Sequence, residues 1–164
     1  MFKRNLKVKK SILIKKNITE IKNILGDFNT WPKWLSWLAQ DLQLEHQNIG
    51  NTLSEGQKQQ WSGPTLGAGF IKTKSIKNNS FKYQMNLLKK NYLIEFLLKE
   101  REEGVMLTCA LNFNLSFIEK LYKQKLEMQA RADITRSLKM LKELCEDNKV
   151  SSEIKILGEQ EVKE

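Results

Sequence analysis

Few side chains in this sequence could carry chemistry, and they follow no familiar catalytic or metal-binding spacing. His46 is the only histidine, and no second His or Cys lies near it, so it cannot build a usual zinc site. As a general base it would need a carboxylate to orient it, and its short strand predicts a solvated side chain instead. Cys109 and Cys145 form no CxxC spacing, and each falls on an apolar face, which predicts two small buried hydrophobic residues.

The charged residues that could act on a ligand have simpler structural explanations. A cluster of glutamates around one expected hairpin should face solvent beside neighbouring lysines; its members are Glu95, Glu100, Glu102 and Glu103. Arg131 and Arg136 flank Asp133, whose spacing of three from Arg136 predicts a local ion pair on a helix. The alternative is a buried arginine that reaches inward to hold a carboxylate ligand. No Ser or Cys lies in a nucleophile motif, so we assign no catalytic residue, no metal ligand and no cofactor.

Composition indicates one ordinary globular domain with a basic surface. The chain has 164 residues, 40% of them hydrophobic, and a formal net charge of +9 from 28 Lys and Arg against 19 Asp and Glu. A basic balance suggests nucleic acid or an anionic membrane as partner, but the lysines are spread over nearly every expected element, so we predict no specific nucleic-acid site. No apolar segment approaches the ~20 residues that span a bilayer, and no signal peptide is recognisable, so we expect a cytoplasmic protein. No oligomeric state can be predicted.

The first half of the chain predicts a strand, two short helices and weaker strands. Alternation predicts a strand over 6–15, and helical spacing predicts a helix over 18–25 that begins after Asn17 and ends at Gly26 in a left-handed conformation. Thr30 can cap a second helix that carries three tryptophans. Three short polar strands and a glycine-rich loop follow, at 41–47, 52–56, 57–62 and 63–69.

The second half predicts an antiparallel meander and one long helix. After a strand over 69–75, period-two patterning over 81–88, 92–100 and 105–116 predicts three strands joined by tight turns. Helical spacing over 117–147 predicts a helix of about 45 Å at ~1.5 Å per residue, long enough to cross a bent sheet. Residues 148–164 are polar and are interpreted as a tail or as the opening of a following domain.

This order of elements resembles the helix-grip fold of the START-like superfamily, also called SRPBCC or polyketide cyclase/dehydrase. The resemblance is carried by residues as well as by order, and it covers about 6–147. Its motifs are Ser11-Ile12-Leu13-Ile14 with Asn17-Ile18; the stretch from Leu25 to Trp34; Gly56, Trp61, Gly63 and Gly69; and the helix end from Ser137 to Glu146, with Ser137 standing where glycine is frequent.

The resemblance implies an α+β domain over 1–147, in which a curved antiparallel sheet of six or seven strands wraps around the long C-terminal helix. Two short helices follow the first strand. It also implies a cavity between the sheet and the long helix. Members bind lipids, sterols, polyketides or plant hormones, some catalyse cyclisation or dehydration, and others bind the heat-shock ATPase or coenzyme Q. We therefore expect binding of a hydrophobic small molecule, with a cyclase/dehydratase-type enzyme or a chaperone-activator-like interaction module as alternatives.

The residues expected to line this cavity lie on inward strand faces or near the middle of the long helix. They are Trp34, Trp61, Phe70, Tyr83, Met85, Phe96, Leu98, Cys109, Phe113, Met128 and Thr135. Tyr83, Thr108 or Thr135 would orient a ligand. The alternative is that these side chains meet and fill the space, because interiors pack tightly. Trp31 and Trp34 are expected to anchor the short helices in the core, whereas Trp37 is expected at the rim.

Overall fold

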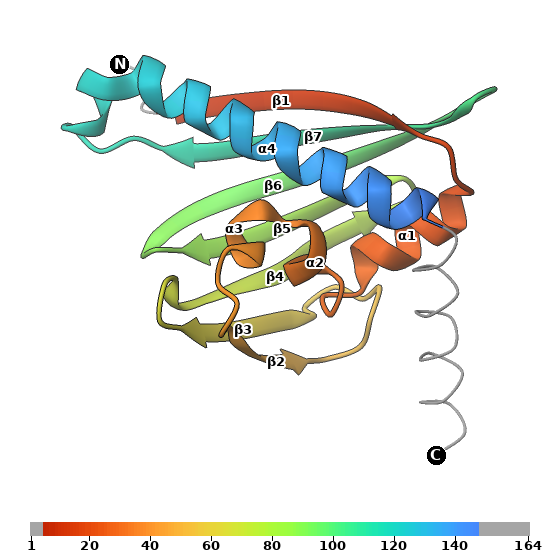
Figure 1. Cartoon of the computed structure of the whole chain (residues 1–164), viewed down its shortest axis with the longest axis horizontal. Helices are drawn as coiled ribbons and strands as arrows, with labels where there is room; N and C mark the ends of the chain where they lie inside the picture. The colour runs from red at the N-terminus through yellow and green to blue at the C-terminus, as the bar shows by residue number, and fades with distance from the viewer. Residues whose placement is uncertain (1–4, 148–164) are drawn as a thin grey trace.

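The computed structural model describes residues 5–147, which form one curved antiparallel sheet gripping a long helix (Figure 1). The predicted tail at 148–164 lies outside the described residues. The elements in chain order are β1 (Asn5–Ile14), α1 (Ile18–Gly26), α2 (Trp31–Trp34), α3 (Ser36–Ala39), β2 (Glu45–Ile49), β3 (Lys58–Gly63), β4 (Gly67–Lys77), β5 (Ser80–Leu87), β6 (Lys90–Arg101), β7 (Gly104–Asn114), the 3₁₀ turn η1 (Glu119–Tyr122) and α4 (Lys123–Glu146).

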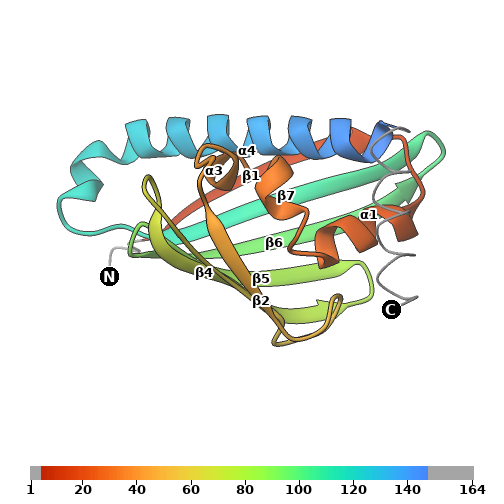
Figure 2. The ribbon, with the colours of Figure 1, turned by 60° about the horizontal axis from the view of Figure 1, so that its bottom comes forward.

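The seven strands lie in the order β1-β7-β6-β5-β4-β3-β2, and every neighbouring pair is antiparallel. Figure 2 shows α4 running along one side of the concave face beside β1 and β7, while α1, α2 and α3 cover the rest of that face. The predicted fold class, with its six or seven strands, two-helix region and long C-terminal helix, is confirmed.

Period-two patterning places the apolar side chains of the meander on the concave face. Residues whose side chains point inward lie opposite one another on neighbouring strands. Phe81, for example, lies opposite Phe96, and Phe96 lies opposite Cys109. All three side chains are at most 5% exposed. A one-residue slip would turn this whole set toward solvent, so burial of one face determines the register of the sheet.

Helix α1 begins and ends for identifiable local reasons. The side chain of Asn17 accepts a hydrogen bond from the backbone N–H of Thr19 at 2.8 Å, as expected of an N-cap. Gly26 is the last helical residue, but its φ is not positive, so the predicted left-handed conformation is wrong. Glycine suits this position because a Cβ would overlap the side chain of Leu53, which packs over the helix end and would have to move.

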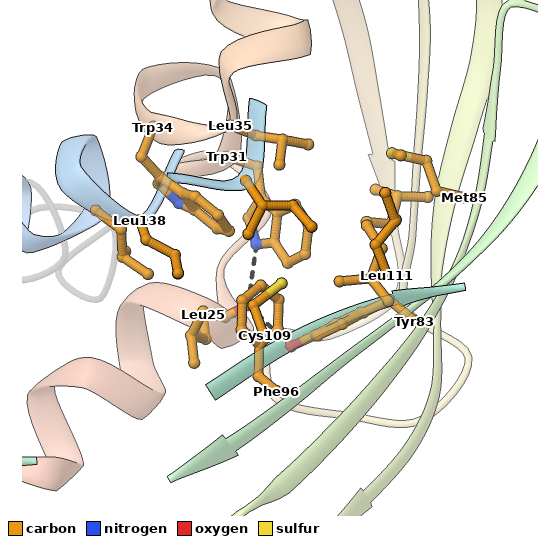
Figure 3. Close-up of a cluster of buried hydrophobic side chains, with 14 of the residues drawn as sticks. Leu25, Trp31, Trp34, Leu35, Tyr83, Met85, Phe96, Cys109, Leu111 and Leu138 are labelled. Carbon is orange, nitrogen blue, oxygen red and sulfur yellow. Dashed lines mark hydrogen bonds between the residues drawn. The ribbon is translucent and has the colours of Figure 1, made fainter. Parts of the chain in front are cut away.

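The C-terminal carbonyl groups of α1 are buried, and side chains from other elements satisfy them. The backbone oxygen of Leu25 accepts hydrogen bonds from the indole N–H of Trp31 at 3.0 Å and from the hydroxyl of Tyr83 at 3.1 Å (Figure 3). The hydroxyl oxygen of Thr30 lies 2.7 Å from the carbonyl oxygen of Ile24 and 2.8 Å from that of Asp27, so its proton serves both acceptors. Helix ends leave such carbonyls without partners, and these contacts remove that cost.

The same side chains form an aromatic cluster in the centre of the concave face. The distance between ring centroids is 4.7 Å for Trp31 and Trp34 and 4.9 Å for Trp31 and Tyr83. Phe28 and Phe96 complete the cluster with edge-on contacts, and all five side chains are at most 1% exposed. The core positions predicted for Trp31 and Trp34 are therefore confirmed. Such ring pairs add about 0.5–1.5 kcal/mol each beyond the burial of their area.

Several predicted boundaries shift for physical reasons. The second helix is interrupted at Leu35, whose ψ of 110° is extended, because the N–H of Ser36 bonds the hydroxyl of Ser137 on α4 at 3.0 Å. The predicted strand at 52–56 is wrong, since these residues form turns, and the strand expected at 41–47 begins instead at Glu45. The long helix begins at Lys123 rather than at 117, after the separate turn η1.

The hydroxyl of Thr30 should contribute measurably to the stability of the fold. Thr30→Val keeps the side-chain shape but leaves the carbonyls of Ile24 and Asp27 without this donor, and it also removes the acceptor of the Trp34 indole N–H at 3.3 Å. We expect the free energy of unfolding to fall by about 1–3 kcal/mol, measured by urea denaturation. Thr30→Ser retains the hydroxyl and is expected to cost less than about 1 kcal/mol. Equal losses in the two variants would contradict the role given to the hydroxyl.

Candidate functional site

Most of the side chains predicted to line a central cavity do converge on the concave face. Eight of the eleven are buried there, namely Trp34, Trp61, Tyr83, Met85, Phe96, Leu98, Cys109 and Phe113. They meet one another instead of enclosing a large space. The hollow left between the sheet and the middle of α4 measures about 10 Å³ and is lined in part by Trp34, Phe96 and Ile134. About this volume is needed to hold one water molecule, so the middle of the grip is filled.

Three predicted lining residues lie elsewhere, and their assignment to the interior is corrected here. Met128 is 72% exposed and Thr135 is also exposed, because at about 100° per residue they fall well away from the buried stripe through Ala130 and Ile134. Phe70 is only half-buried and lies on the convex face, opposite Gln60 and Asn86, while its neighbour Ile71 points inward.

The polar groups predicted to orient a ligand are likewise occupied or turned away. The hydroxyl of Tyr83 is held by the Leu25 carbonyl, and burial raises the pKa of this phenol above its usual value. Thr108 bonds Ser11 at 2.8 Å on the exposed face, and Thr135 bonds the carbonyl of Arg131 on its own helix. Burial raises the pKa of the Cys109 thiol to about 12, so this thiol stays protonated at neutral pH.

Trp61 packs as part of the core and not as a ligand-stacking group. Its side chain is 3% exposed and lies against Gly69 of the neighbouring strand. A Cβ at position 69 would stand 2.6 Å from the indole nitrogen, so only glycine lets the two strands meet at this point.

We call the space between the concave face of the sheet and α4 the grip. An open pocket lies at one end of it, where α3, the start of α4 and the β5–β6 hairpin approach one another. Its volume is about 430 Å³. We call it the mouth pocket. Its apolar walls come from Trp37, Leu66, Leu87, Leu88, Tyr92, Leu111, Phe113, Leu126 and Ala130. The rings of Trp37 and Tyr92 stack at 6.3 Å and form a continuous aromatic wall. Of the predicted lining residues, Phe113 belongs to this pocket, and the half-buried Trp37 forms part of its wall.

Three charged side chains and a phenol line the same pocket. Asp133 accepts a hydrogen bond from the indole N–H of Trp37 at 3.1 Å, and Lys90 pairs with Glu119 at 2.6 Å. The Lys90 hydrogen bond, followed by one from the backbone N–H of Ser116, lowers the pKa of Glu119. Burial, then the charges of Glu119 and Asp133, raises the pKa of Tyr92. The pocket therefore presents the phenol of Tyr92, whose raised pKa keeps it protonated at neutral pH, beside the carboxylate of Glu119, whose lowered pKa keeps it charged there.

The remaining titratable candidates form ordinary surface contacts. Arg131 pairs with Glu127 at 2.9 Å, and Arg136 lies 3.9 Å from Asp133, which confirms the local pair predicted from their spacing. Both arginine side chains are well exposed, so neither reaches into the interior. His46 is exposed on β2. Among residues 5–147, no three His, Cys, Asp or Glu side chains gather as metal ligands, and no helix is long and apolar enough to cross a membrane.

Sequence reasoning missed most of the mouth pocket, although part of the signal was present. Tyr92 has the same strand parity as Ile94 and Phe96, and Ala130 lies on the predicted apolar stripe, so both could have been identified as inward-facing. Lys90 and Glu119 could not, because their pairing depends on where the chain turns after β7.

Comparisons with known proteins support the fold. No protein-family model matches the chain, and no curated protein does so either. A protein of unknown function from Staphylococcus aureus, SA2116, is 13% identical with a TM-score of 0.71, over 87% of this chain and 94% of that chain. StfQ, a di-domain ARO/CYC from the steffimycin biosynthetic pathway, is 12% identical with a TM-score of 0.66, over 87% of this chain and 51% of that chain. DynU16, from the dynemicin biosynthetic locus, is 13% identical with a TM-score of 0.63, over 88% of this chain and 49% of that chain. At these identities the likeness shows the helix-grip fold alone.

The ion pair at the mouth pocket predicts a pH-dependent contribution to stability. Because the folded-state pKa of Glu119 lies below the ordinary carboxyl value of 4.5, the pair stabilises the fold above that value and is lost as pH falls through the folded pKa. We expect Glu119→Gln to lower the free energy of unfolding by up to about 1 kcal/mol at neutral pH. The difference should shrink well below pH 4.5, as measured by urea denaturation at both pH values.

Glu103→Gln is the matched control, because it removes an exposed carboxylate on the β6–β7 turn at the opposite end of the sheet. It should change the free energy of unfolding by less than about 0.5 kcal/mol. A loss for Glu119→Gln that grows as the pH falls would contradict the sign of the shift.

Proposed function

We propose that this chain is a START-like domain that binds an amphipathic small molecule in the mouth pocket. The observation that carries the proposal is the contrast between the two hollows of the grip, about 430 Å³ at its end and about 10 Å³ in its middle. Ligand pockets for small molecules usually measure roughly 300–1,000 Å³, and they combine apolar walls with a few polar groups. The mouth pocket is of this kind.

The walls and the polar groups indicate how a ligand would lie. An apolar body would rest against the stacked rings of Trp37 and Tyr92 and on the methyl group of Ala130, and burial of that surface would supply most of the affinity. A polar end would lie near the Lys90–Glu119 pair, where both a donor and an acceptor are present. The phenol of Tyr92, kept protonated by its raised pKa, would add a further hydrogen-bond donor.

This placement differs from the central cavity that the family resemblance implies. The middle of the grip is closed by Trp31, Trp34 and Tyr83, so a ligand that occupied it would have to displace buried aromatic side chains. The mouth pocket requires no such displacement.

The proposal can be tested with two variants on one helix. Ala130→Phe places a ring in the mouth pocket, whereas Ala132→Phe, two residues further along α4, places the same ring in solvent. The probe is the amphipathic dye 1-anilinonaphthalene-8-sulfonate, whose fluorescence reports binding. We expect its affinity to fall at least about tenfold in Ala130→Phe. Ala132→Phe should bind the probe like the original protein, and thermal unfolding of both variants would verify that they fold.

Native mass spectrometry of the protein from its own source gives an independent readout of the same site. A retained adduct should be present in the original protein and in Ala132→Phe, and absent from Ala130→Phe. Equal probe binding and equal adducts in the two variants would contradict a ligand site at the mouth.

A further inference from the structure

Five large apolar side chains stand exposed beside the mouth pocket. Leu88 is 62% exposed at the tip of the β5–β6 hairpin, and four residues between β7 and α4 are 59–76% exposed. These four are Phe117, Ile118, Leu121 and Tyr122. We call the five together the mouth patch. Single exposed apolar residues need no explanation, but five large ones gathered at the same end of a molecule indicate an interaction surface.

Hydrogen bonds hold the β7–α4 part of the mouth patch in a defined conformation. The backbone N–H of Ser116 donates to the carboxylate of Glu119 at 2.8 Å, and the backbone N–H of Glu119 donates to the hydroxyl of Ser116 at 3.2 Å. This reciprocal pair is a capping box, and the two residues inside it are Phe117 and Ile118. The exposure of their side chains is therefore imposed by a structured turn.

The same glutamate joins the two parts of the mouth patch. The other carboxylate oxygen of Glu119 pairs with Lys90 at 2.6 Å, two residues beyond Leu88. The ion pair thus brings the β5–β6 hairpin beside the turn η1, and Figures 1 and 2 both show these segments at the same end of the molecule. Leu88, Lys90 and Glu119 also line the mouth pocket, so the pocket opens next to the mouth patch.

The hairpin tip has an unusual sequence for its conformation. Leu87 pairs with Lys90, so the loop has two residues, Leu88 and Lys89, with φ of 52° and 63°. Such loops favour Asn and Gly, because other side chains are strained at positive φ. Here the strained positions carry a leucine and a lysine that are both exposed, where they can contact a partner but add little to the core.

Four lysines lie close to the mouth-patch residues in the sequence. Lys89 lies on the hairpin, and Lys120, Lys123 and Lys125 follow the capping box. None of these four forms an ion pair with another residue in the range 5–147. The nearest glutamates in the sequence, Glu119 and Glu127, are already paired with Lys90 and Arg131. The region therefore combines apolar side chains with uncompensated positive charge.

We propose that the mouth patch docks on an anionic lipid surface. Apolar side chains flanked by lysines suit such a surface, because the former enter the boundary between headgroups and acyl chains while the latter meet the negative lipids. A symmetric contact with a second copy would bring two lysine-rich patches together, and the repulsion between their positive charges would oppose it. Docking would turn the opening of the mouth pocket toward the bilayer. The inference goes beyond the proposed function, and it holds whether or not the pocket takes a ligand.

Vesicle co-sedimentation tests the docking directly. We expect the protein to bind vesicles that contain phosphatidylglycerol and to bind vesicles of phosphatidylcholine alone more weakly. The double variant Phe117→Ser/Leu121→Ser should lose roughly tenfold or more in apparent affinity for the anionic vesicles, since two large apolar side chains no longer enter the membrane. Lys120→Glu/Lys123→Glu should lose affinity as well, and added salt should weaken binding by the original protein.

A matched control removes two equally apolar side chains elsewhere. Leu93→Ser/Leu97→Ser changes two residues of β6 that are each 40% exposed on the convex face of the sheet. This variant should bind anionic vesicles like the original protein. Circular dichroism and the thermal midpoint of every variant verify folding.

Three outcomes would overturn the proposal. The first is no binding to either kind of vesicle, and the second is equal loss of affinity in the β6 control and in the mouth-patch variant. The third is a dimer that Phe117→Ser/Leu121→Ser converts to a monomer while vesicle binding stays unchanged, as sedimentation velocity would reveal. Because no pocket ligand is used, failure here leaves the test of the mouth pocket unaffected.

Discussion

The carbonyl groups at the C-terminal end of α1 impose the constraint on which the interior of this protein depends. They lie beneath the short helices and away from solvent, so each must find a donor within the protein. The donors are the indole of Trp31, the hydroxyl of Tyr83 and the hydroxyl of Thr30. Because two of these donors sit on large aromatic side chains, satisfying the helix end also brings two rings into the centre of the grip. The ring of Trp34 is held in the same place, since its indole N–H donates a hydrogen bond to the hydroxyl of Thr30. The hydrogen bonds to the α1 carbonyl groups and the packing of the aromatic rings thus stabilise the same closed interior.

Because the middle is closed, we propose that a ligand is held at the end of the grip. There the stacked Trp37 and Tyr92 provide an apolar wall, and the Lys90–Glu119 pair provides charge. The capping box at Ser116 gives that end a defined shape, because it determines how Glu119 meets the hairpin and how the neighbouring apolar side chains are presented. In this account the pocket and the surface around it depend on one glutamate, whose two carboxylate oxygens bond different parts of the chain.

Strand faces could be predicted from the sequence because alternation is a local property that burial then enforces, as the inward positions of Tyr83, Phe96 and Cys109 show. The order of elements likewise sufficed for the fold. Patterning assigns a side chain to a face but gives no volume, so it could not decide whether Trp34 lines a cavity or fills one. Met128 was misplaced because it lies near the middle of the helix but well away from its apolar stripe. The mouth pocket escaped prediction because its polar pair joins segments that only the folded chain brings together.

Aromatic side chains close the middle of the grip, and we propose that a ligand binds at the mouth instead. Intermolecular nuclear Overhauser effects between the protein and bound 1-anilinonaphthalene-8-sulfonate test it most directly. We expect contacts from the probe to the ring of Trp37, the ring of Tyr92 and the methyl group of Ala130, and none to Trp34 or Ile134. Contacts to Trp34 and Ile134, with the ring of Trp34 shifted to admit the probe, would contradict it.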